Sequence, residues 1–167
     1  DQSIRFLPRP ADYLFLYMLS FYLLIISLKI NYKYALFGSI AFGFSTYLII
    51  ILGVGHNTKA LAIGYLPLVI MGVLMIFKKD FLKGFLITSL ALGLQIHSNH
   101  YQITYYTLIV IMIMFLVFFI DLIKKKDFKI FFYCLSTFTF SSIIALMMNA
   151  SGLLSTKEYS EFSTRSK

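Results

Sequence analysis

Charged residues are scarce in this 167-residue sequence: Asp, Glu, Lys and Arg make up 13% of it, about half of the share in soluble domains. There is no Trp, and a single cysteine, Cys134, excludes a framework of internal disulfides. Apolar residues are abundant instead, at 59% of the chain and a mean hydropathy of +0.83. So few charges cannot cover the core of a soluble domain. The composition therefore predicts an all-α protein that crosses a membrane several times.

Long stretches without a charged residue predict the membrane spans, because a helix needs about 20 apolar residues to cross the hydrocarbon core. The longest stretch, 84–120, is too long for one span, and His97-Ser98-Asn99-His100 within it predicts a tight turn. We therefore expect a polytopic transmembrane helix bundle of about six spans, at 11–29, 34–54, 59–77, 82–97, 101–123 and 128–148. Residues 149–167 are expected to form a polar, extracytoplasmic tail. Because the chain begins at Asp1, we also expect it to be a piece of a longer protein.

Lysines gather in the loops on one side of the expected bundle. Three short loops hold nine of them: Lys29, Lys33, Lys78, Lys79, Lys83, Lys124, Lys125, Lys126 and Lys129. An excess of lysine in short loops is typical of the cytoplasmic side. The net charge of +8 then reflects topology and attraction to anionic lipids of the bilayer, and we expect no nucleic-acid partner.

The polar residues that could do chemistry fall largely on the opposite, extracytoplasmic side, which predicts a site at that face. The first candidates are Arg9, between two prolines, and Asp12, which follows them at the start of the first span. A helix N-terminus favours an anion such as the Asp12 carboxylate. A helix cap and membrane anchor is the ordinary alternative to a role in a polar site.

A second cluster consists of His56, Asn57 and Lys59, where glycines end one span and the next span begins. Free backbone N–H groups and a cation converge at such a helix N-terminus, which suits a phosphate. The alternative is a positively charged anchor at the membrane interface.

A third cluster consists of Asn99, His100 and Gln102, after the short span at 82–97. Because that span is short, the turn is expected to lie recessed into the membrane face. Hydrogen bonding to sugar hydroxyls or acid–base work suits these side chains, and a simple polar turn is the alternative. Tyr105 nearby could stack on a sugar face or belong to an interfacial aromatic belt.

Metal binding is not indicated by this pattern. His97 and His100 are three residues apart, but no Cys, Asp or Glu lies near them, and a zinc site needs three or four ligands. We therefore expect no metal and no cofactor. Arg165, in the polar tail, is a further candidate for one rim of the site.

Four segments of the chain occur in a recognisable order. They are Leu7-Pro8-Arg9-Pro10-Ala11-Asp12-Tyr13-Leu14-Phe15-Leu16-Tyr17, Gly55-His56-Asn57-Thr58-Lys59, Asn99-His100-Tyr101-Gln102-Ile103-Thr104-Tyr105-Tyr106, and Glu158-Tyr159 with Ser163-Thr164-Arg165. Together they resemble the YfhO-like membrane proteins of Bacteroidetes-type bacteria, which are grouped with the GT-C glycosyltransferases. The resemblance spans nearly the whole chain.

The resemblance implies a multi-span enzyme in the bacterial cytoplasmic (inner) membrane. Such an enzyme transfers a sugar from a polyprenyl-phosphate carrier to a glycopolymer or glycolipid of the cell envelope, at the extracytoplasmic face. It further implies that the acidic catalytic residue precedes Asp1 and that this piece alone is inactive. A GT-C-like bundle is therefore the expected fold.

Under this hypothesis, Lys59 and His56, with Arg9 or Arg165, bind the carrier phosphate through charge-assisted hydrogen bonds. The third cluster then contacts the sugar or the acceptor. A transporter or flippase-type bundle is an alternative, although it would need ionisable residues near the bilayer midplane rather than at span ends. A non-catalytic membrane scaffold is another.

Overall fold

The structure, a computed structural model, describes residues 7–162, which form eight helices and no strand. The helices are α1 (Ala11–Ser27), α2 (Tyr32–Gly43), α3 (Thr46–Gly53), α4 (Asn57–Phe77), α5 (Phe81–His97), α6 (Tyr101–Lys125), α7 (Phe128–Met148) and α8 (Ala150–Phe162). The predicted all-α fold is confirmed. Helices α4 to α7 begin and end within two residues of the last four predicted spans.

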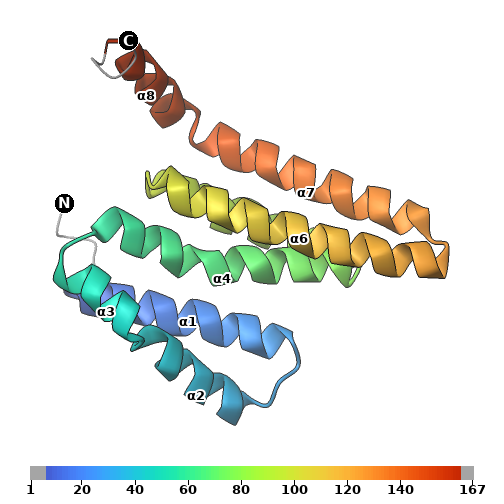
Figure 1. Ribbon diagram of the computed structural model, residues 1–167, viewed down its shortest axis with the longest axis horizontal. Helices are drawn as coiled ribbons and strands as arrows, with labels where there is room; N and C mark the ends of the chain where they lie inside the picture. The colour runs from blue at the N-terminus through green and yellow to red at the C-terminus, as the bar shows by residue number, and fades with distance from the viewer. Residues whose placement is uncertain (1–6, 163–167) are drawn as a thin grey trace.

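Helix α4 is the centre of the bundle and contacts α1, α3, α5, α6 and α7 (Figure 1). The larger hydrophobic cluster joins α4 to α5, α6 and α7, with Val73, Leu92 and Phe115 among its members. A smaller cluster joins α4 to α1 and α3, and includes Tyr17 and Leu48. The chain therefore packs on both sides of α4.

The backbones of α4 and α5 approach each other closely at two glycines. A Cβ atom on Gly72 would lie 2.8 Å from the backbone nitrogen of Thr88, and one on Gly84 would lie 2.8 Å from that of Ile76. No side chain fits at such distances. Glycine at these two positions therefore allows close packing of the two helices.

The segment predicted as one span at 34–54 is divided in the structure. Helix α2 ends at Gly43, and α3 begins at Thr46 after a bend of 43°. Ser45 between them has extended backbone angles (φ −60°, ψ 140°), which is typical of the residue that precedes a new helix. The segment predicted as one span is therefore a bent pair of helices, with a break at residues 44–45 that no charge or proline marks.

The expected polar tail is helical over its described part. Helix α8 follows α7 after Asn149, whose side-chain amide donates to the carbonyl of Gly93 on α5 at 2.9 Å. Leu153 of α8 packs against the larger hydrophobic cluster. These two contacts explain why the chain forms a helix where composition alone predicted a tail.

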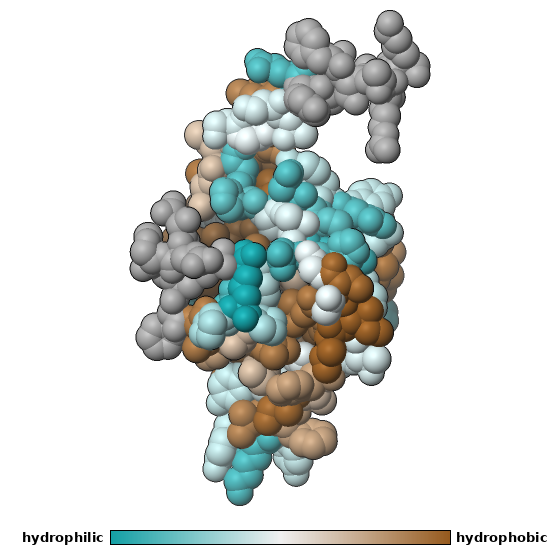
Figure 2. All heavy atoms as spheres, turned by 90° about the vertical axis from the view of Figure 1, so that its left-hand side faces the viewer, coloured by the Kyte–Doolittle hydropathy of each residue, from teal (hydrophilic) through white to brown (hydrophobic). Residues whose placement is uncertain are grey.

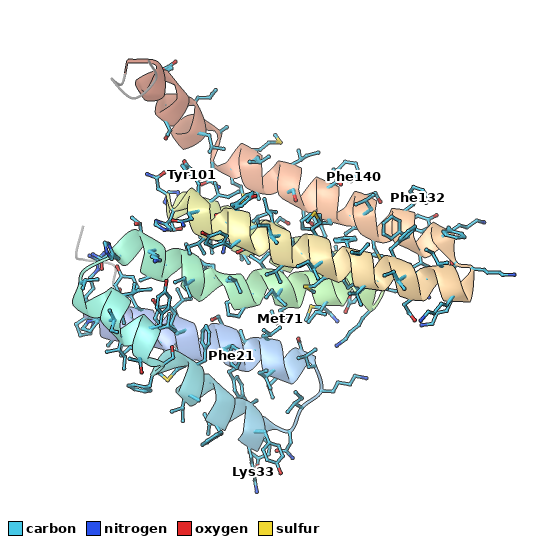
Figure 3. The ribbon with its side chains drawn as sticks, in the orientation of Figure 1. Phe21, Lys33, Met71, Tyr101, Phe132 and Phe140 are labelled. Carbon is cyan, nitrogen blue, oxygen red and sulfur yellow. The ribbon has the colours of Figure 1, made fainter. Side chains whose placement is uncertain are left out.

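Apolar side chains cover the outer faces of α6 and α7. Met112 and Phe132 are 65% and 67% exposed, and Phe132 and Phe140 lie along α7 in Figure 3. Helices α4, α6 and α7 are long and apolar enough to cross a membrane, and the bent pair of α2 and α3 counts as a fourth span if taken together. The chain is thus a membrane protein with transmembrane helices. The count of six stays a prediction, because α1 and α5 have 17 residues each.

The two ends of the bundle differ in chemistry. The loops after α1, α4 and α6 lie at one end, which we call the lysine end (Figure 1). There the ammonium of Lys78 donates to the carbonyl of Ser27 at 2.6 Å. The start of α1, the α3–α4 loop and the α5–α6 turn lie at the other end, which we call the motif end. All three predicted clusters are at the motif end.

The glycine contact between α4 and α5 can be tested with a matched pair of variants. Gly72→Ala forces a Cβ atom against α5 and is expected to lower the free energy of unfolding by about 1–3 kcal/mol. Gly53→Ala in α3, where a Cβ meets nothing within 4 Å, is expected to have no such cost. The readout is heat-induced labelling of the sole, fully buried thiol, Cys134, by a fluorogenic reagent in detergent. Equal midpoints for the two variants would contradict the packing argument.

Candidate functional site

The α3–α4 loop has a tightly defined shape. Gly55 takes a positive φ of 74°, a conformation that suits glycine because it has no Cβ. The next amide, of His56, then donates to the carbonyl of Ile51 at 3.1 Å and closes the end of α3. His56 becomes the residue before α4, and Lys59 lies in the first turn of that helix.

The α5–α6 turn confirms the tight turn predicted at residues 97–100. Asn99 takes a positive φ of 58°, and its backbone N–H donates to the carbonyl of Ile96 at 3.0 Å. Asparagine is the residue after glycine that best tolerates this conformation at a helix end. His100 follows as the residue before α6.

One buried amide sets the register of α4, α5 and α6 close to the motif end. Gln95 of α5 is fully buried, and its Nε2 donates to the carbonyl of Ala62 on α4 at 2.9 Å. The same nitrogen donates to the Thr107 hydroxyl of α6 at 3.0 Å. The N-termini of α4 and α6 are thereby held near each other.

The site that results is a cluster of His56, Lys59 and His100, which we call the cationic cluster. Burial lowers the pKa of the His100 imidazole, and the nearby charges of Lys59 and His56 lower it further. The His100 Nε2 atom is buried and has no hydrogen-bond partner among the described residues. Residues more than forty positions apart in the sequence therefore lie near enough here for their charges to interact.

Backbone donors add to the positive potential of this cluster. Neither His56 nor His100 caps its helix through its side chain. First-turn N–H groups that bond to no other group remain available to a ligand. In α4 the Asn57 N–H already donates to the Gly55 carbonyl at 2.8 Å, and in α6 the Ile103 N–H donates to the His100 carbonyl at 3.1 Å. Two helix N-termini, each with partial positive charge, thus border the same cluster.

Carboxylates do not neutralise these charges within the described residues. The two ion pairs found there, Lys83 with Asp80 at 2.9 Å and Lys125 with Asp121 at 2.6 Å, both lie at the lysine end. The Lys59 ammonium instead lies 5.4 Å from the centre of the Tyr47 ring. The motif end therefore keeps its positive charge available.

Arg9 and Asp12 lie at the motif end but make local contacts. The Arg9 guanidinium lies 5.4 Å from the centre of the Tyr13 ring, and Asp12 Oδ1 accepts from the Tyr13 amide at 2.9 Å. No contact among the described residues joins either residue to the cationic cluster. Asp12 lies in the first turn of α1, where its carboxylate interacts favourably with the positive end of the helix dipole, as expected.

No side-chain hydrogen bond among the described residues joins the remaining candidates to the cationic cluster. Gln102 donates from Nε2 to the Tyr106 hydroxyl at 2.8 Å, and Tyr105 is 62% exposed. Asn57, the first residue of α4, is half-buried. Arg165 lies outside the described residues.

A cavity of about 240 Å³ opens beside the α5–α6 turn. His97 and Asn99 line it from the turn, and Asn149 and Thr156 line it from the α7–α8 corner. Sequence reasoning missed Asn149. Its signal was an amide directly after the apolar run of α7, which has meaning only once that side chain bonds to Gly93 on α5.

Hydrophilic residues gather on the face that Figure 2 presents, which is the motif end of the bundle. Within residues 7–162, no group of three or more His, Cys, Asp or Glu side chains could hold a metal ion. The chemistry that this end offers is therefore cationic and hydrogen-bonding.

Fold and site together define the class: an all-α membrane protein with a cationic cluster at one end of its bundle. No protein-family model, no curated protein and no solved structure matches the chain.

The electrostatic link within the cationic cluster predicts a change in the titration of His100. Lys59→Gln removes a positive charge and is expected to raise the His100 pKa, though not to the ordinary value of about 6.5, because burial persists. Carbon-13 histidine NMR in nanodiscs measures it, with Lys129→Gln at the lysine end as control. An unchanged His100 pKa in Lys59→Gln would contradict the cluster.

The lowered pKa of His100 also predicts how the free energy of unfolding depends on pH. The lowered pKa means that the unfolded chain takes up a proton at His100 before the folded chain does. The contribution of His100 is thus complete above about pH 6.5 and is lost as pH falls through its lowered folded value.

Proposed function

We propose that this chain is part of an integral membrane glycosyltransferase of the bacterial cytoplasmic membrane. In this proposal a sugar passes from a polyprenyl-phosphate carrier to a cell-envelope acceptor at the extracytoplasmic face. The observation that carries it is the cationic cluster, in which two helix N-termini and Lys59 converge without a carboxylate among the described residues. Such an arrangement suits a phosphate at the membrane surface.

The chemistry follows from that placement. The oxygen of an acceptor hydroxyl attacks the anomeric carbon of the carrier-linked sugar, and the bond from that carbon to the phosphate oxygen breaks. The bonding electron pair leaves with the phosphate, where Lys59 and His56 stabilise the developing charge. A neutral His100 imidazole carries one N–H donor and one nitrogen acceptor, which suits hydrogen bonding to a sugar hydroxyl.

A base must take the proton of the attacking hydroxyl. Asp12 is a described carboxylate at the motif end, but its Oδ1 accepts from the backbone of its own helix. We therefore assign Asp12 no catalytic role. In this proposal the base is an acidic residue outside residues 7–162.

A transporter or flippase is less well supported. Such a bundle needs ionisable residues at mid-depth in the membrane. In the described transmembrane helices the ionisable side chains of Asp, Glu, Lys, Arg and His lie in the first or last turns.

The phosphate role is tested by substitution in the full-length protein. Lys59→Ala is expected to lower transfer from a polyprenyl-phosphate sugar by about ten- to a hundredfold, because a hydrogen bond to a charged group contributes about 1.5–3 kcal/mol. His100→Ala is expected to lower it as well. Lys129→Ala, at the other end, is the control for a lost lysine charge. Wild-type transfer rates in the Lys59 and His100 variants, with normal membrane insertion, would refute the assignment.

The proposed orientation is tested separately. A cysteine placed at exposed His56 should react with a membrane-impermeant maleimide added outside intact cells, whereas one placed at Lys79 should react only after lysis. The native Cys134 is buried and contributes little background. Reversed labelling would mean that the motif end faces the cytoplasm.

A further inference from the structure

The polar cavity beside the α5–α6 turn adjoins a second, apolar space. This groove has a volume of about 190 Å³ and runs between α5, α6 and α7, with Leu108 and Leu146 in its walls. Ile96, Tyr101 and Leu153 line both spaces. The two spaces are therefore adjacent, with polar side chains around the one at the motif end and apolar side chains around the one along the helices.

The polar part offers hydrogen bonds rather than charge. Its described lining contains no Asp, Glu, Lys or Arg. The side-chain NH2 group of Asn149 donates to the carbonyls of Gly93 and Ala145, each at 2.9 Å. Its Oδ1 is thus left as an acceptor, and Asn99 and Thr156 add both donors and acceptors. Neutral hydroxyl groups match this set better than a phosphate.

The apolar part contains one hydroxyl without a partner. Thr104 is 8% exposed, lines the groove, and its Oγ1 has no hydrogen-bond partner among the described residues. It lies one turn from Tyr101, where the groove meets the polar cavity. The Thr104 hydroxyl therefore lies near the residues that the groove shares with the polar cavity.

We propose that the cavity and groove bind a membrane glycolipid. Its neutral sugar head lies among Asn99, Asn149 and Thr156, and one acyl chain follows the groove past Leu108. This site is distinct from the cationic cluster, which takes the phosphate. That this glycolipid is the sugar acceptor rests on the proposed function. That the cavity and groove bind a glycolipid does not depend on it.

The experiment exploits the absence of tryptophan from the chain. Leu146→Trp places one fluorophore in the groove, and Met147→Trp, 66% exposed and one residue away, is the depth-matched control. Each is measured in dioleoylphosphatidylcholine nanodiscs with monoglucosyldiacylglycerol that carries brominated acyl chains, which quench tryptophan. Brominated phosphatidylcholine and phosphatidylglycerol are the comparison lipids.

The glycolipid is expected to reach half-maximal quenching of Leu146→Trp at about a tenfold lower mole fraction than phosphatidylcholine, as one or two added hydrogen bonds predict. The three lipids should quench Met147→Trp alike. Adding Asn99→Gly, which keeps the positive-φ turn but removes the amide, should reduce the preference.

Two results would overturn the proposal. Equal quenching of Leu146→Trp by glycolipid and phosphatidylcholine would mean ordinary bilayer contact, and a preference for phosphatidylglycerol would mean an anion site. Labelling of Cys134 verifies the fold, and Leu108→Trp replaces Leu146→Trp if that variant does not fold. Lys59→Ala should leave the glycolipid preference unchanged, so failure of the phosphate assignment and failure of this inference are distinguishable.

Discussion

The hydrogen bonds of one buried amide hold together the part of the bundle on which its proposed site depends. Gln95 reaches from α5 to a carbonyl of α4 and a hydroxyl of α6, in surroundings where no water competes. Apolar contacts between helices are not directional, and lipid chains compete for them. Directional hydrogen bonds between three helices therefore fix the register of those helices. The same register brings the N-termini of α4 and α6 near each other.

Close packing and charge placement follow from that register. Gly72 and Gly84 allow α4 and α5 to approach until their backbones touch, so a small shift of either helix would be resisted. The motif end then holds Lys59 beside two helix N-termini, while the carboxylates of α5 and α6 pair with lysines at the far end. The difference between the ends arises from packing as much as from composition.

Sequence reasoning located four helices well, because a long uncharged run in lipid has few alternatives to a helix. It missed the break at residues 44–45, since Phe44 and Ser45 are as compatible with a helix as their neighbours. It missed α8 for a related reason. That helix is stabilised by the packing of Leu153 against the core and by the hydrogen bond from Asn149 to Gly93, and both contacts exist only in the folded bundle.

The scarcity of charge was enough to establish a helical membrane protein, because the bilayer penalises every unpaired backbone group and every buried charge. The sequence also named His56, Lys59 and His100 as candidates, each from its local pattern. It could not say that they meet, or that Arg9, Asp12 and Tyr105 make other contacts. Proximity between residues far apart in the chain is decided by helix register, and that register depends on contacts such as those of Gln95 which only the folded bundle contains.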